Sequence, residues 1–401
     1  MFKVLLFLLF ASMGYPAPTF PTPLWVGHFC CVFGYFCTFF AVRELKLKIP
    51  QLTDIQQLSI DSMRTFVQQE VKPNEALLRF GPASREQLLE FTQAVAEFGL
   101  PGLAVPKALG GSGMDWVTQA RLFEELVKGS LELASVVLVN MLAVELLIER
   151  PALCNQYLPD LLAGRSIASL GLMVQSDCSA LRAQRLAHGL LIDGNIDEVA
   201  GGLWANLLIS SVLVDDQHAC LVLLDRRRDR YETRGIRLES NAARVLVTAA
   251  RVEKEYCLGE VEPGSTLSRR MLDFVRLHEA IAQVAQGQVI VEGALAKSAQ
   301  GFCSTSERLV SLHLAEMITQ VESARLMCQH GLSLAQDHRD CEMESNMALF
   351  FTQGAIERIE RHAAWVNGPG GDRNAVGTLQ LGPLCASKTL TACDIVRQRP
   401  A

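Results

Sequence analysis

One stretch constrains the fold more than any other: residues 271–301, which contain no proline and carry apolar or small side chains at helical spacing. These side chains recur at Leu272, Val275, Ala282, Ala285, Val289 and Ala296. The period is typical of a long buried helix, which would span about 45 Å at 1.5 Å per residue. Because many of its residues are small, neighbouring helices can approach it closely. The stretch therefore predicts the central helix of a helical bundle.

The rest of the chain divides into a helical part, a β part and a second helical part. Helical patterns cover residues 55–71, 85–98, 121–128, 131–149, 307–330, 342–366 and 391–398. Short β-branched runs predict strands at residues 207–214, 218–224 and 244–252. We therefore expect a mainly α protein with a central β-domain. Its predicted parts are an N-terminal α domain over residues 50–165, a middle β domain over 166–262 and a C-terminal α bundle over 263–401.

An apolar leader precedes these parts at residues 1–49. Residues 24–42 carry no formal charge, and nineteen residues are just enough to span membrane hydrocarbon. The cations that follow, Arg43, Lys46 and Lys48, would hold the main body on the cytoplasmic side. We expect a cytoplasmic protein, and two interpretations of the leader stay open. It is a membrane anchor acting through residues 1–42, or it is not part of the working protein.

Composition excludes several classes of function. The net charge of −6 and the lack of a basic face argue against a nucleic-acid partner. The twelve cysteines are scattered and form no C-x-x-C pair, which indicates reduced thiols rather than a disulfide scaffold. The eight histidines do not cluster at ligand spacing, so we predict no metal site.

Two motifs resemble one enzyme family. Residues 99–116 read GLPGLAVPKALGGSGMDW, a loop whose glycines and prolines forbid a regular helix. This loop resembles the G-L-x-G-L-x-V-P-x-x-x-G-G-x-G signature of acyl-CoA dehydrogenases, and residues 272–276 resemble the family's L-D-x-x-R segment. The resemblance covers roughly residues 50–400. It implies an N-terminal α-helical domain, a β-barrel or sandwich, and a C-terminal four-helix bundle.

The resemblance also implies a chemistry. Members of the family are flavoprotein oxidoreductases of fatty acid metabolism that use FAD to dehydrogenate an acyl-CoA thioester between its α- and β-carbons. Homo-oligomers and an electron-transfer partner are implied in the same way. The positions that match family motifs for binding FAD are Ser176, Gly368, Gly371 and Asp394. Asp273 and Arg276 match the positions beside the acyl thioester and are our predicted substrate-binding residues.

The family's catalytic glutamate is missing from both of its usual positions, which hold Leu390 and Val275 here. Neither aliphatic side chain can accept a proton. Glu279 lies one helical turn beyond Val275 and is the weak candidate for a replacement base, although it is displaced by roughly 5–6 Å. Three functions therefore stay open: an acyl-CoA dehydrogenase with another base, a flavin-dependent monooxygenase of the same fold, and a catalytically inactive homologue.

Overall fold

The computed structural model describes residues 52–80, 83–171, 181–199, 201–214, 218–236, 242–260, 266–299 and 304–367. All described residues belong to one compact unit within residues 49–401. The predicted leader and the predicted helix at residues 391–398 lie outside the described residues.

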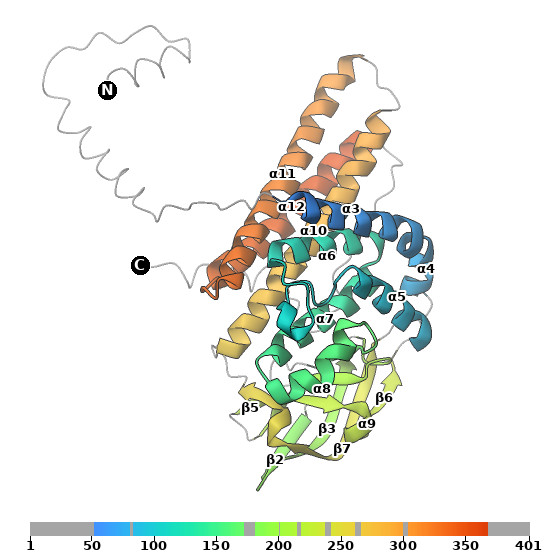
Figure 1. Cartoon of the computed structure of the whole chain (residues 1–401). Coiled ribbons are helices and arrows are strands. Elements are labelled where there is room, and N and C mark those ends of the chain that lie inside the picture. Colours follow the sequence, from blue (N-terminus) through green and yellow to red (C-terminus); the bar gives the residue numbers. More distant parts are fainter. Residues whose placement is uncertain are drawn as a thin grey trace, which may run out of the picture. The chain divides into compact units, whose positions relative to one another are not determined.

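The N-terminal part of this unit is helical (Figure 1). Its α-helices are α3 (Asp54–Phe66), α4 (Glu75–Phe80), α5 (Arg85–Glu97), α6 (Trp116–Gly129), α7 (Leu131–Ile148) and α8 (Pro151–Leu162). Thr53 and Ser84 begin α3 and α5 with capping boxes, each accepting a bond from the backbone N–H three residues on. The helix predicted over residues 55–71 ends in a π-helical turn, Val67–Val71. The helix predicted to start at residue 121 begins at Trp116, because the Asp115 side chain caps it there.

The glycine-rich loop packs tightly on the helices beside it. A Cβ on Gly102 would lie 2.1 Å from the Leu162 side chain of α8, and one on Gly111 would lie 2.2 Å from the Val105 carbonyl oxygen. Gly110 adopts a φ of 90°, a left-handed conformation that L side chains rarely adopt. Gly102 and Gly111 therefore serve close packing, and Gly110 serves the turn of the backbone.

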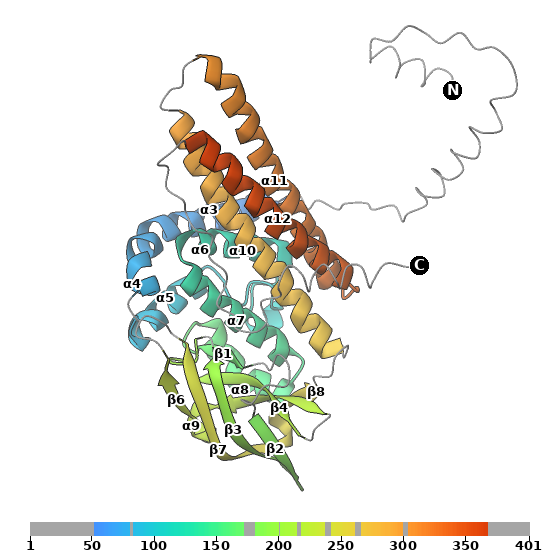
Figure 2. The ribbon, with the colours of Figure 1, turned by 180° about the vertical axis from the view of Figure 1, so that it is seen from behind.

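The middle part is a mixed sheet of eight described strands, seen from behind in Figure 2. The strands are β1 (Ala168–Gly171), β2 (Leu181–Leu186), β3 (Gly189–Val199), β4 (Leu207–Leu213), β5 (Ala219–Asp225), β6 (Glu232–Gly235), β7 (Ala243–Glu253) and β8 (Cys257–Glu260). Their order is β6-β7-β3-β2-β4-β5-β8, and β1 pairs with β4. β1 and β2 run parallel to β4, whereas the other pairs are antiparallel. The three predicted strands correspond to β4, β5 and β7.

The C-terminal part consists of three long described helices, α10 (Thr266–Ser298), α11 (Ser304–Gln336) and α12 (Glu342–Asn367). The predicted central helix is α10, which packs along both others and also contacts α6 and α7 (Figures 1 and 2). Small residues permit this packing: a Cβ on Gly287 would lie 3.0 Å from Ile356 and 3.2 Å from Ile359 of α12. A fourth bundle helix was predicted at residues beyond those described.

Among the described residues, only α7 is long and apolar enough to cross a membrane. The protein interior buries 72% of that helix, so it is a core helix here. The described cysteines all carry free thiols, at Cys154, Cys220, Cys257, Cys328 and Cys341. No three histidine, cysteine or acidic side chains in this part of the chain gather to hold a metal ion.

Candidate functional site

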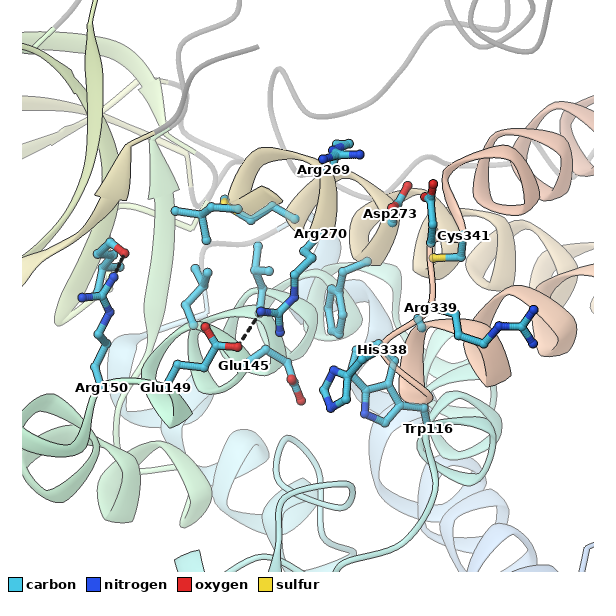
Figure 3. A pocket seen from close by; sticks show the side chains of 18 residues that line it. Trp116, Glu145, Glu149, Arg150, Arg269, Arg270, Asp273, His338, Arg339 and Cys341 are labelled. Atoms are coloured by element: carbon cyan, nitrogen blue, oxygen red, sulfur yellow. Dashed lines mark hydrogen bonds and ion pairs between the residues drawn. The ribbon is translucent and has the colours of Figure 1, made fainter. Parts of the chain in front are cut away.

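A cavity of about 410 Å³ lies where α6, α7, α10 and β8 meet the connection between α11 and α12 (Figure 3). One part of its wall is apolar. The side chains there are Trp116, Leu142, Leu146, Leu258, Leu267, Met271 and Phe274. The Trp116 and Phe274 rings meet edge to face, with centroids 5.7 Å apart. Such a wall suits an acyl chain or another apolar group.

Charged groups line the rest of the cavity (Figure 3). The cations are Arg150, Arg269, Arg270 and Arg339, and the acids are Glu145, Glu149, Asp273 and Asp340. The Arg270 guanidinium lies 2.5 Å from a Glu149 carboxylate oxygen, and Arg150 donates a hydrogen bond to the Leu258 carbonyl. The four acids balance the four cations in number, but Arg269 and Arg339 are exposed, and guanidinium groups beside an apolar wall can bind an anionic amphiphile.

Asp273, a predicted substrate-binding residue, lines this cavity. Its Oδ1 accepts a hydrogen bond of 2.6 Å from the Ser345 hydroxyl and lies 3.7 Å from Arg276. Burial raises the pKa of Asp273 to about 6, although Ser345 and Arg276 oppose the shift. Arg276, the second predicted residue, is buried behind Asp273 and does not line the cavity. The structure thus brings the pair together with only the carboxylate facing the cavity.

Val275 and Glu279 lie on α10 but do not line the cavity. Both are buried, with 2% and 4% of their surface exposed. Glu279 accepts a hydrogen bond of 3.3 Å from Gln283 on the next turn. The candidate base that we took from the sequence therefore lies in the packed interior, away from the cavity.

His278, which the sequence analysis did not single out, is buried between two rings. It stacks on Phe274 at 4.2 Å between centroids and meets Phe123 edge to face at 5.6 Å. Its Nδ1 lies 2.7 Å from the Phe274 carbonyl oxygen, which can only accept, so Nδ1 carries the proton. Burial lowers the pKa of His278 to about 4, so the ring is neutral at physiological pH.

Glu145 is a cavity residue that the sequence motifs did not identify, because it lies in the predicted helix at residues 131–149 and outside every family motif. The side chain is partly buried and faces the cavity (Figure 3). Burial raises the pKa of Glu145 to about 7; Arg270 opposes the shift and Glu149 adds to it. A signal was available, since Glu132 and Glu145 are the two acids that interrupt the otherwise apolar run of α7.

The positions predicted to bind FAD, Ser176, Gly368, Gly371 and Asp394, lie outside the described residues, as does Leu390. Of the predicted site residues, the structure therefore describes Asp273, Arg276, Val275 and Glu279. Only the first of these lines the cavity.

Several curated proteins are similar to this chain. A probable acyl-CoA dehydrogenase of Bacillus subtilis, YngJ, is 24% identical over 344 residues, covering 80% of this chain and 90% of the relative. The caffeyl-CoA reductase-Etf complex subunit CarC of Acetobacterium woodii is 25% identical over 305 residues, covering 70% and 79%. The human mitochondrial short-chain specific acyl-CoA dehydrogenase is 23% identical over 346 residues, covering 79% and 82%.

Solved structures share the fold. A glutaryl-CoA dehydrogenase of Mycobacterium smegmatis superposes with a TM-score of 0.73 at 18% identity, covering 86% of this chain and 94% of the other. The butyryl-CoA dehydrogenase of Megasphaera elsdenii gives a TM-score of 0.71 at 17% identity, covering 87% and 94%. The expected fold class, helical terminal parts around a central β part, is therefore confirmed.

The family itself is recognised in both helical parts of the chain. The acyl-CoA dehydrogenase N-terminal domain matches residues 53–165, and the acyl-CoA dehydrogenase C-terminal domain matches residues 263–378. These matches together cover more than half of the sequence and flank the mixed sheet. With them, the shared fold and the curated relatives, the chain belongs to the acyl-CoA dehydrogenase family of flavoproteins.

Proposed function

We propose that this flavoprotein binds an acyl-CoA thioester in the cavity beside α10 and dehydrogenates it between the α- and β-carbons. The observation that supports this most is the combination of one apolar wall with four guanidinium groups in a single cavity. An acyl-CoA has the matching parts, an apolar chain and a phosphorylated nucleotide. Membership of the family supports the same assignment.

The rim arginines have a specific role in this proposal. Arg269 and Arg339 are exposed at the cavity and can meet phosphate groups, whereas Arg270 is already engaged by Glu149. Asp273 and Arg276 are the substrate-binding positions taken from the family motif. In the structure Asp273 faces the cavity, and Arg276 supports it from behind.

FAD is the cofactor that we propose, since solved neighbours include a glutaryl-CoA dehydrogenase in complex with FADH2 and PigA with FAD and proline. When bound, FAD would accept the hydride that leaves the β-carbon. The residues proposed to hold it are Ser176, Gly368, Gly371 and Asp394. The cavity's aromatic and guanidinium side chains are of a kind that suits a ring joined to phosphates, so the described residues are chemically compatible with such a ligand nearby.

The visible spectrum of the purified protein tests the proposal. Bound flavin that loses its yellow colour when butyryl-CoA or octanoyl-CoA is added without oxygen supports dehydrogenation. Flavin that accepts electrons from a reductase but ignores both thioesters supports the monooxygenase alternative. Protein that stays colourless after FAD is added and the excess removed would contradict the dehydrogenase and support an inactive homologue.

We also propose that the protein is a homo-oligomer that passes its electrons to a partner protein. Apolar side chains exposed on the C-terminal helices support a protein contact there: Leu309 (49% exposed), Leu312 (57%) and Trp365 (51%). The relative CarC is named as a subunit of a complex with Etf, which supports an electron-transfer partner. Sedimentation equilibrium of the full chain tests the first point, and a monomer at micromolar concentration would contradict it.

For localisation we propose a cytoplasmic protein. Two interpretations of the leader are tested: a membrane anchor acting through residues 1–42, or a segment that is not part of the working protein. Cell fractionation compares the full chain with a variant that starts at residue 50. Recovery of the full chain in the soluble fraction would exclude a spanning leader.

A further inference from the structure

We propose that Glu145 is the catalytic base that removes the α-proton of the bound thioester. This inference rests on the proposed function and deepens it by naming the residue that replaces the family's missing glutamate. It assigns the base to α7, whereas the two usual positions lie at Leu390 and on α10 at Val275.

The position of Glu145 suits a base. It lies on α7 between Leu142 and Leu146, which line the apolar wall, and its side chain borders the same cavity (Figure 3). An acyl chain lying along that wall would pass beside the carboxylate. The side chain is partly buried, so it is accessible to a ligand and shielded from bulk water.

The other carboxylates of the cavity are occupied or solvated. Glu149 pairs with Arg270 at 2.5 Å and is 57% exposed. Asp273 accepts from Ser345 and lies beside Arg276. Asp340 is exposed and accepts from the backbone N–H of Glu342 at 3.3 Å. Glu145 makes no hydrogen bond or ion pair within the described part of the chain, so its lone pairs can accept a substrate proton.

The surroundings of Glu145 also adjust its affinity for a proton. The titratable and charged groups that face the cavity with it are Glu149 and Arg150 beside α7, Arg269, Arg270 and Asp273 on α10, and His338, Arg339, Asp340 and Cys341 between α11 and α12. Burial is the largest cause that raises the pKa of Glu145 to about 7. The Arg270 charge lowers this pKa, and the Glu149 charge raises it further. A base with a pKa near the working pH is the most effective one, since it is deprotonated and still basic.

The step balances as follows. The Glu145 carboxylate takes the α-proton and becomes a carboxylic acid, while the electron pair of that C–H bond forms the Cα=Cβ double bond. FAD, when bound, would be the oxidant and would accept the hydride and its electron pair from Cβ. The products would be an enoyl-CoA, reduced flavin and protonated Glu145, which returns its proton to solvent.

The test separates proton removal from dehydrogenation. The flavin of the whole protein is first reduced with dithionite, so hydride transfer is blocked, and butyryl-CoA or octanoyl-CoA is then incubated in D2O. Mass spectrometry follows the replacement of α-hydrogens by deuterium. We expect the natural protein to catalyse this exchange, and Glu145→Gln to slow it by about 100-fold or more, in the range of general-base effects. The exchange rate should rise with pH through about 7 in the natural protein and lose that rise in Glu145→Gln.

Three further variants serve as controls. Glu132→Gln removes the other acid of α7, which lies outside the cavity, and should leave exchange unchanged. Glu145→Asp keeps a carboxylate with a shorter reach and should restore part of the exchange rate. Such a partial rate would show that Glu145→Gln lost the carboxyl group and not the fold. Glu279→Gln tests the position taken from the sequence.

The proposal is wrong if Glu279→Gln abolishes exchange while Glu145→Gln keeps it, or if Glu145→Gln and the natural protein exchange at equal rates. Failure of the thioesters to reduce oxidised flavin, with exchange intact, would instead overturn the proposed function alone.

Discussion

At the scale of single residues, burial decides the protonation of this site. Four groups near the cavity have displaced pKa values, and burial is the largest cause in each: Asp273, His278, Glu145 and Cys341. Burial disfavours the charged form, so it raises the pKa of a carboxyl group and lowers that of an imidazole. The beginning of α10 therefore presents an acid of raised pKa, Asp273, to whatever occupies the cavity, while the neutral His278 ring stays buried in the interior.

His278 makes the protein's stability depend on pH. In the unfolded chain its pKa is near 6.5, and in the folded protein it is about 4. The unfolded state binds the proton first, so stability is fully present above pH 6.5 and is lost as pH falls toward 4. The loss is about 3 kcal/mol at 1.36 kcal/mol per pKa unit. Urea unfolding at pH 7 and at pH 4 measures this loss in the free energy of unfolding. Because His278→Phe lacks the imidazole, its loss between the two pH values should be smaller by about 3 kcal/mol. Equal losses in the two proteins would contradict the prediction.

The hydrogen bond from Ser345 to Asp273 is a second test at this scale. Ser345→Ala removes a buried donor from a carboxylate, which costs about 1.5–3 kcal/mol for a bond to a charged group. The loss should shrink at pH 5, because Asp273 has a pKa of about 6 and is then mostly protonated. Chemical denaturation at pH 8 and pH 5 checks both points. A loss that stays constant with pH would show that Asp273 is not the partner that matters.

At the scale of elements, helices were easier to predict than strands. The 3.6-residue period of α10 is visible in its own sequence, and so are the caps of α3 and α5. In contrast, β2 is the half-exposed run LRAQRL and β6 is ETRG, and neither carries a β-branched pattern. Their strand conformation comes from pairing with β3 and β7, which no local signal specifies. Glu145 was missed for a related reason: its charge stands out in the sequence of α7, but no local signal shows that its side of the helix borders a cavity.

The contact between α6 and α11 depends on a buried ion pair. Glu124 is buried on α6, and Arg325 of α11 lies 2.8 Å from its carboxylate. Arg325→Ala leaves that charge with Arg121 at 2.5 Å and Lys128 at 3.9 Å, so we expect a loss of about 3 kcal/mol, the lower end for breaking a buried pair. Arg165→Ala is the matched control, since Arg165 and Asp160 form an exposed pair and should contribute less than about 1 kcal/mol. Thermal unfolding of both variants measures their losses in the free energy of unfolding. Equal losses for Arg325→Ala and Arg165→Ala would contradict the prediction.

The glycine-rich loop gives another prediction at this scale. Gly111→Ala places a methyl group 2.2 Å from the rigid Val105 carbonyl oxygen, so the backbone must move. We expect a loss of about 2–3 kcal/mol, as for other overpacked sites. Gly293→Ala is the control, because a Cβ there meets nothing within 4 Å and a helical alanine is favourable. If Gly111→Ala unfolds at the same urea concentration as the natural protein, the loop is less tightly packed than described.

At the scale of the whole molecule, the cavity is a long-range product of the fold. It brings together Trp116, Glu145, Leu258, Phe274 and Cys341, which lie on separate elements across more than half of the sequence. Sequence motifs found the family and the Asp273 position. They could not find the cavity, because its members share no spacing and meet only when α10 crosses α6 and α7.

Ligand binding provides the prediction for the whole molecule. If an acyl-CoA occupies this cavity, a concentration one hundred times its Kd raises the free energy of unfolding by about 2.7 kcal/mol. Differential scanning fluorimetry with octanoyl-CoA measures the accompanying rise in Tm. The double variant Arg269→Gln, Arg339→Gln removes two exposed cavity cations and should need more ligand for the same rise. If the double variant shows the same rise in Tm at the same octanoyl-CoA concentration, the nucleotide of the acyl-CoA does not bind at these two arginines.

Ligand binding in the cavity should also restrain the C-terminal helical bundle, through α10. α10 carries cavity residues on its first two turns and bundle contacts along its remaining length, as a single unbroken helix of 33 residues. A ligand that contacts Arg270 and Phe274 restrains the N-terminal end of α10 and suppresses its fraying. Because α10 is continuous and packs against α11 and α12, the restraint extends to these two helices. Backbone amide protons in the core of the bundle should therefore exchange with solvent more slowly when a ligand occupies the cavity.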